Sequence, residues 1–160
     1  MIIKEANIRD AETLTRIAFK AKRFWNYPEE YFEIWRDELT LSSEYILKNS
    51  VFVAYENKHI IGFYSIVYNT ENFYSGKVLV EKGFWLEHIF VLPDHHQNGV
   101  GKELIKHAIN YSKKNGINSL KIFVDPFAEG FYKKMKAIFK YMSPSSIKDR
   151  EIPVYELFIN

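Results

Sequence analysis

The segment that most constrains the fold is residues 89–104, which read Ile-Phe-Val-Leu-Pro-Asp-His-His-Gln-Asn-Gly-Val-Gly-Lys-Glu-Leu. The pattern is typical of a strand that ends at a proline, a polar turn with two glycines, and the first turn of a helix. Glycine permits positive φ and lets the backbone approach a ligand closely. A helix N-terminus presents unpaired amides and a partial positive charge. Together these features predict an anion site, most often for phosphate, and a phosphorylated cofactor at residues 98–102.

The composition favours one globular domain and excludes several classes of function. A length of 160 residues predicts a single domain spanning 1–160, and 47% apolar residues are enough for a packed core. The net charge of +2 without a Lys/Arg run argues against a nucleic-acid surface. The absence of cysteine excludes disulfides, thiolate catalysis and cysteine zinc sites. No apolar run reaches the ~20 residues of a membrane span, and the start lacks a signal-peptide pattern, so we expect a cytoplasmic protein.

The apolar spacing predicts an α/β fold of the α+β type, with a central mixed sheet flanked by helices. Strands are expected over 1–8, 51–55, 59–68, 77–91 (one long strand or a pair), 119–124 and 154–159. Helices are expected after Asp10 as N-cap, from Pro28, from Gly101 to a stop at Gly116, and after Asp125.

Two better-known phosphate loops match the glycines poorly. A P-loop needs a glycine five residues before Gly101 and a Ser or Thr two residues after it, where this chain has His96 and Glu103. The dinucleotide fingerprint needs a third glycine where Leu104 stands. An acid about twenty residues on does exist, Asp125, so a nicotinamide dinucleotide enzyme stays an alternative. A glycine-rich turn without a ligand is the simplest alternative.

Two blocks of the sequence resemble the GNAT superfamily of acyl-CoA-dependent N-acetyltransferases, in an uncharacterised branch. The first is Val-Leu-Pro at 91–93 followed by Gly-Val-Gly at 99–101, and the second is Asp-Pro-Phe-Ala-Glu-Gly-Phe-Tyr at 125–132. The chain departs from the family pattern at His96, where Arg or Gln is usual, and at Asp125, where Asn is usual. The likeness spans nearly the whole chain, including 25–28, 37–40 and the tail from 144, and it implies a GNAT-like fold.

The resemblance implies an enzyme that transfers acetyl from acetyl-CoA directly to a primary amine of a small molecule or peptide in a ternary complex. The lack of cysteine and of a Gly-x-Ser-x-Gly elbow agrees with transfer that forms no acyl-enzyme. Main-chain amides would bind the pyrophosphate, and a backbone N–H near Val91 would polarise the thioester carbonyl. The residues expected to contact acetyl-CoA are Ile89, Phe90, Val91, His96, Gln97, Asn98, Gly99, Val100, Gly101, Lys102, Asp125 and Tyr132.

Two side chains are expected to move protons. Glu87 is the candidate base for the amine, directly or through water, because its side chain is expected on the same strand face as those of Ile89 and Val91. His88 is the alternative base. Tyr132 matches the family's usual proton donor to the leaving thiolate. Each has a structural alternative, since Glu87 could pair with a lysine and Tyr132 lies on the apolar stripe of its helix.

The substrate side is less determined. A non-catalytic acyl-CoA-binding or regulatory module of the same fold is an alternative to an enzyme, and the identity of the amine acceptor stays open. Arg150 is a candidate contact for an acceptor carboxylate. His95 and His96 lack the further ligands of a zinc site, so no metal is expected. A homodimer is an open alternative to a monomer.

Overall fold

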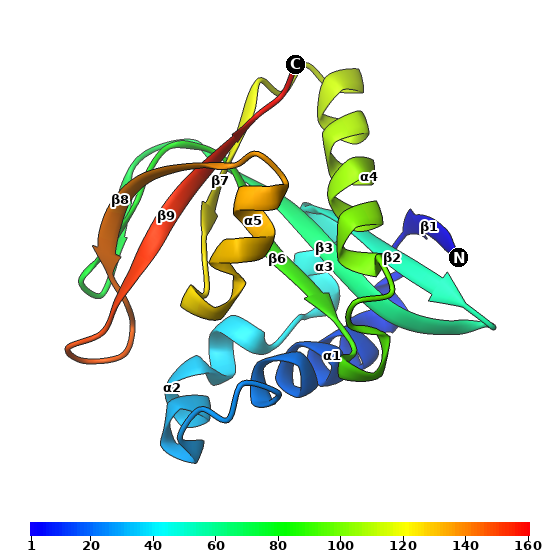
Figure 1. Cartoon of the computed structure of the whole chain (residues 1–160), viewed down its shortest axis with the longest axis horizontal. Coiled ribbons are helices and arrows are strands. Elements are labelled where there is room, and N and C mark those ends of the chain that lie inside the picture. Colours follow the sequence, from blue (N-terminus) through cyan, green and yellow to red (C-terminus); the bar gives the residue numbers. More distant parts are fainter. The chain divides into compact units, whose positions relative to one another are not determined.

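The computed structural model describes residues 1–160, and Figure 1 shows how its strands and helices are arranged along the chain. The strands are β1 (Ile2–Glu5), β2 (Ser50–Glu56), β3 (His59–Asn69), β4 (Phe73–Ser75), β5 (Val78–Val80), β6 (Gly83–Val91), β7 (Ser119–Phe123), β8 (Ile138–Pro144) and β9 (Glu151–Phe158). The α-helices are α1 (Ala11–Arg23), α2 (Glu29–Leu39), α3 (Ser43–Lys48), α4 (Val100–Lys114) and α5 (Glu129–Lys134). Short 3₁₀ turns are η1 (Ile8–Asp10), η2 (Pro93–His95) and η3 (Pro126–Ala128).

Seven strands hydrogen-bond in the order β1-β2-β3-β6-β7-β9-β8, and β4 and β5 form a separate hairpin. The pair β6–β7 is parallel, whereas β1–β2, β2–β3, β7–β9 and β8–β9 are antiparallel. The predicted α/β class with a mixed central sheet flanked by helices is therefore confirmed. The chain forms two compact units, residues 1–66 with 88–108, and residues 67–87 with 109–160. A single domain spanning 1–160 stays a prediction.

In the first unit, α1 forms as its apolar spacing predicts. Its buried positions are Leu14, Ile17, Ala18 and Ala21. Asp10 occupies the expected N-cap position but makes no capping bond to α1. Its carboxylate instead accepts the Asn7 N–H at 2.7 Å, because the turn η1 precedes the helix and uses Asp10 in its own capping box.

The hairpin β2–β3 confirms the strands expected over 51–55 and 59–68. Gly62 in β3 allows an unusually close approach to β6. A Cβ at Gly62 would lie 2.8 Å from the Phe90 carbonyl oxygen and 3.3 Å from the Val91 side chain. Any larger residue would therefore push the end of β6 away from β3.

In the second unit, α5 is tied to β9, beside which it lies in Figure 1. The Tyr155 hydroxyl donates to the Glu129 carboxylate at 2.7 Å, and Leu120 and Ile122 of β7 are buried. The run 77–91 is two strands rather than one, but β5 pairs with β4 and not with β6. The sequence did not predict β4, β8 or α3, since β8 is exposed at six of its seven positions and lacks a clear alternation.

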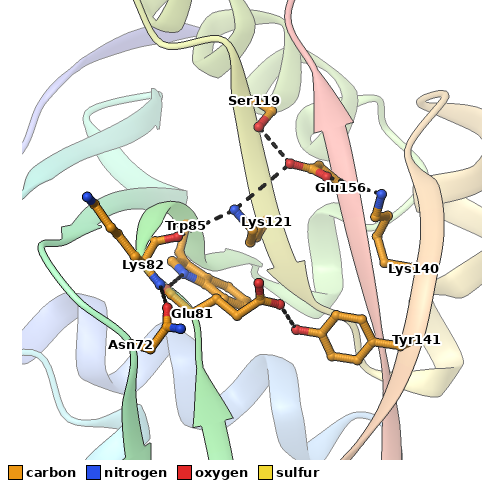
Figure 2. Close-up of polar contacts among 9 residues, drawn as sticks. All are labelled: Asn72, Glu81, Lys82, Trp85, Ser119, Lys121, Lys140, Tyr141 and Glu156. Atoms are coloured by element: carbon orange, nitrogen blue, oxygen red, sulfur yellow. Dashed lines mark hydrogen bonds and ion pairs between the residues drawn. The ribbon is translucent and has the colours of Figure 1, made fainter.

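A network of polar contacts holds the start of β6 in this unit (Figure 2). The Trp85 indole donates to the Glu81 carbonyl at 2.8 Å, and the Tyr141 hydroxyl donates to the Glu81 carboxylate. On the neighbouring strands, the Glu156 carboxylate lies 4.0 Å from the Lys121 ammonium and 3.6 Å from that of Lys140. Trp85 is 2% exposed, and its ring stacks on that of Phe123 with centroids 4.5 Å apart.

Candidate functional site

The connection from β6 to α4 has the backbone geometry of an anion cradle. Gln97 and Gly99 both adopt positive φ, 64° and 81°, which turns the chain sharply before the helix. The α-helix α4 begins at Val100, and the Glu103 N–H donates to the Gly99 carbonyl at 3.0 Å. The amides of Val100 and the next two residues therefore have no carbonyl partner one turn earlier in the helix. They are available to an anion at the positive end of a fifteen-residue helix.

The surroundings of these amides fit a diphosphate. A Cβ built at Gly99 meets no atom within 4 Å, so the backbone is open to a ligand. Val100 is buried and anchors the helix start, whereas Asn98 and Lys102 are exposed. The Lys102 ammonium has no ion-pair partner in the chain, so it is free to contact a phosphate. The backbone at 98–102 is thus open as an anion site requires, and the binding of an anion there stays a prediction.

The side chain of His96 does not point into solvent. Its Nε2 lies 3.0 Å from the Val91 carbonyl oxygen. Its ring contacts Phe24 edge to face, with centroids 4.8 Å apart, and stacks on Trp25 at 6.5 Å. His95 is likewise engaged, with Nδ1 3.4 Å from a carboxylate oxygen of Glu56. Sequence reasoning missed these contacts, and the only available signal was the pair of adjacent aromatics at the end of α1.

The last residues of β6, Ile89, Phe90 and Val91, are half-buried. The strand end is held to β3 by the bond from the Leu92 N–H to the Ile61 carbonyl at 2.8 Å. This segment is the one in which the sequence predicted a backbone donor for a carbonyl oxygen. The structure leaves that role a prediction.

His88, the alternative base, is buried in an aromatic environment in the first unit. Its ring lies 5.7 Å from that of Tyr45 and 6.2 Å from that of Phe63. Burial, and secondarily the Lys22 charge, lower the pKa of His88 to about 4. The imidazole is therefore neutral at physiological pH but a weak proton acceptor, which makes it a poorer general base than its sequence position suggested.

Two predicted residues of the second unit lie at an exposed strand position and a helix start. Glu87 is exposed on β6, and it interacts with other groups of the chain. The Asp125 carboxylate accepts the Phe127 N–H at 3.0 Å and so caps η3. This confirms the predicted N-cap at Asp125, while its contact with a cofactor stays a prediction.

Tyr132, in α5, combines a buried ring with a hydroxyl that is left available. The residue is 5% exposed. Burial, and secondarily the Asp125 charge, raise the pKa of Tyr132 well above its usual range, so the phenol keeps its proton. The hydroxyl makes no hydrogen bond within the chain, and Ser112 Oγ is the only side-chain polar atom that is both fully buried and unpaired. The Tyr132 hydroxyl therefore reaches the surface without a partner, unlike that of Tyr155, which is bound to Glu129.

A separate pocket of about 520 Å³ lies at the turn between β8 and β9. It is lined by Lys77, Pro144, Ser145, Ile147, Lys148, Asp149, Arg150 and Glu151. The turn is closed by the bond from the Ser145 N–H to the Arg150 carbonyl at 2.9 Å. Arg150, the candidate for an acceptor carboxylate, is thus a pocket residue, and none of the residues predicted to contact the donor lines this pocket.

No helix of the chain is both long enough and apolar enough to cross a membrane. The side chains of histidine, aspartate and glutamate form no group of three or more that could hold a metal ion.

The fold defines an α/β protein with open main-chain amides at the start of α4, and comparison with known proteins identifies its family. The model of the acetyltransferase (GNAT) family matches residues 12–136. The chain therefore belongs to the GNAT acetyltransferase family, as the two sequence blocks predicted. No curated protein matches the sequence.

Solved structures share the fold at low sequence identity. The PaiA N-acetyltransferase from Thermoplasma acidophilum, in complex with coenzyme A, is 21% identical with a TM-score of 0.70, and the match covers 98% of each chain. The ribosomal-protein-S18-alanine N-acetyltransferase from Escherichia coli is 18% identical with a TM-score of 0.66, covering 99% of this chain and 93% of that one. A GNAT family acetyltransferase from Brucella melitensis in complex with acetyl-CoA is 19% identical with a TM-score of 0.61, covering 99% and 88%.

Proposed function

We propose that this protein is an acetyl-CoA-dependent N-acetyltransferase that acetylates a primary amine of a small molecule or peptide in a ternary complex. The observation that carries the proposal is the open backbone at Gly99 and the start of α4, in a chain of the GNAT acetyltransferase family. Structural neighbours with bound coenzyme A or acetyl-CoA support acetyl-CoA as the donor.

The cradle would bind the donor through main-chain groups. The amides from Gln97 to Lys102 would receive the pyrophosphate, with the Lys102 ammonium adding a charge-assisted contact. His96, Asn98 and Val100 contribute here through their backbone. The end of β6 would receive the thioester, with the Val91 N–H donating to its carbonyl oxygen as negative charge develops there. Ile89 and Phe90 would contact the donor along the same strand.

The transfer needs the nitrogen to lose two protons and the sulfur to gain one, after which water restores the proton of the group that protonated the sulfur. The acceptor enters as an ammonium and must lose a proton before its nitrogen lone pair can attack the thioester carbonyl carbon. Glu87 would take this proton, directly or through a water molecule. The attack forms the C–N bond, the nitrogen then loses its second proton to water, and the C–S bond breaks as the sulfur leaves with the electron pair. The Tyr132 hydroxyl would donate its proton to that thiolate, because it is protonated and has no other partner in the chain.

The acceptor class is tested with a panel of amines. One neighbour is named a ribosomal-protein-S18-alanine N-acetyltransferase, so peptide amines belong on the panel beside small amines. Amines that carry a carboxylate belong there too, because Arg150 lines a pocket of the second unit. Release of free thiol from acetyl-CoA reports turnover with each amine.

The variants Glu87→Gln and Tyr132→Phe are assayed on the best amine, with calorimetric titration of CoA and of NAD as the binding control. We expect the wild-type protein to turn over the amine and each variant to lower that turnover by about 100-fold. Neither variant should appreciably change the affinity for CoA. Binding of CoA without turnover on any amine would favour the non-catalytic module. Tight binding of NAD without binding of CoA would overturn the proposal.

A further inference from the structure

The imidazole of His96 joins the two segments that would hold the donor. A carbonyl oxygen can only accept, so the 3.0 Å contact requires that His96 Nε2 carry the proton and donate to Val91. Val91 is the last residue of β6, and Gln97, the first residue of the cradle, follows His96 directly. The side chain therefore closes the turn between strand end and cradle into a ring of six residues.

Two backbone hydrogen bonds make the same turn compact. The His95 N–H donates to the Leu92 carbonyl at 2.9 Å, and the His96 N–H donates to the Pro93 carbonyl at 3.1 Å. These bonds shape η2 but leave the Val91 carbonyl to the imidazole. Within the turn, it is the His96 side chain that bonds back to the strand end itself.

Two aromatic residues from the end of α1 hold the imidazole in place. Phe24 meets the ring at an interplanar angle of 84°, and Trp25 is nearly parallel to it at 25°. The two aromatic rings also contact each other, with centroids 4.9 Å apart. Phe24 is 48% exposed, so its contribution to the core is small and the imidazole is one of its main contacts. We call Phe24 and Trp25 the aromatic clamp.

We propose that His96 is a positioning residue that sets the spacing between the diphosphate cradle and the thioester-binding end of β6, and that the aromatic clamp holds it in that geometry. The inference rests on the proposed function. If the donor is bound both at the cradle and at the end of β6, the distance between these two regions sets the position of the thioester carbonyl. A displacement of the reacting carbonyl by about 1 Å can lower the rate by about 100-fold. Arg or Gln, usual at this position, lacks an imidazole that could be clamped in this way.

Two ligands distinguish binding at the cradle from binding at the end of β6. ADP carries the diphosphate but not the pantetheine arm, whereas CoA carries both. In His96→Phe the ring stays in the clamp but the N–H is lost. We expect the affinity for ADP to change by less than about twofold and the affinity for CoA to fall by about fivefold, because a hydrogen bond of this kind contributes about 1 kcal/mol. Turnover should fall by about tenfold or more.

Two further variants decide whether the effect belongs to the hydrogen bond and the clamp. His96→Gln keeps a side-chain N–H but has no ring for the clamp to hold, so it should restore the CoA-to-ADP affinity ratio only in part, to a value between that of His96→Phe and that of the wild type. Phe24→Ala removes one wall at an exposed position and should lower the ratio by about threefold. If His96→Phe does not fold, the CoA-to-ADP affinity ratio of Phe24→Ala is the deciding measurement.

Equal weakening of ADP and CoA would mean that His96 merely supports the cradle, and it would overturn the inference. So would an unchanged ratio in His96→Phe or Phe24→Ala, or a Gln variant that behaves like the Phe variant. These readouts need binding only. A protein that binds CoA with the expected ratio but acetylates no amine would contradict the proposed function and leave the positioning role supported.

Discussion

Acidification should destabilise the protein through one buried histidine. Burial, with a smaller contribution from the Lys22 charge, lowers the pKa of His88 to about 4, against about 6.5 in an unfolded chain. Between these two values the unfolded state binds more protons than the folded state. The stability associated with neutral His88 is therefore complete above pH 6.5 and is lost as the pH falls toward 4.

The magnitude follows from the two pKa values. Linkage between an unfolded pKa of about 6.5 and a folded pKa of about 4 gives a loss of about 2 kcal/mol between pH 7 and pH 5, and about 3 kcal/mol by pH 4. This is a large part of the 5–15 kcal/mol that is typical of a folded domain. Tyr45, Phe63 and Phe90 lie near the ring, and the Lys22 charge acts on it. None of these four residues is an acid that could stabilise the protonated His88 ring.

Urea unfolding at pH 7 and pH 5 measures the effect, with His88→Phe as the matched control. The variant keeps an aromatic ring in the same site, so the titration of all other groups cancels in the difference between the two proteins. We expect the wild-type protein to lose about 2 kcal/mol more than the variant over this interval. NMR titration of the His88 ring in the wild-type protein provides a readout that needs no variant. A midpoint near 6.5, or parallel losses in the two proteins, would refute the reasoning.

The remaining predictions concern the donor site and the strand contact beside it. Gly99→Val should weaken CoA binding in calorimetry by about tenfold or more, because it strains a residue at φ +81° and narrows the open backbone; Gly116→Val, at φ +69° and equally open, is the control that should bind normally. Tyr132→Phe should lower turnover by about 100-fold while CoA affinity stays unchanged, and equal losses in both would make it a packing residue. Gly62→Ala should lower the free energy of unfolding by about 1–3 kcal/mol, because its Cβ would lie 2.8 Å from the Phe90 carbonyl oxygen; a thermal midpoint equal to that of the wild type would argue against that contact.

The features that the sequence predicted well are those set by local chemistry. The hairpin β2–β3 follows from two β-rich runs around a short turn, and α4 stops where Gly116 adopts positive φ. The open backbone of the turn before α4 was predictable for the same reason, since two glycines between a strand and a helix favour such a shape, whereas the binding of an anion there stays a prediction.

The features that were missed depend on partners distant in sequence. Nothing near His96 in the chain indicates that its ring lies against Phe24, some seventy residues earlier. The turn η1 takes the Asp10 carboxylate away from α1, which the apolar spacing could not reveal. The strand β8 is exposed at most positions and is defined by pairing with β9 rather than by its own pattern. Short elements of this kind gain their stability from tertiary context.

The stacking of Trp25 on His96 gives the protein an intrinsic optical probe. The other two tryptophans, Trp35 and Trp85, are 3% and 2% exposed, so we expect their emission to respond little to the solvent. Trp25 is half-buried and lies next to the turn that leads into the cradle. We therefore expect the long-wavelength edge of the emission to come mainly from this indole, so that its change on addition of CoA would report binding at the turn before α4 without a label.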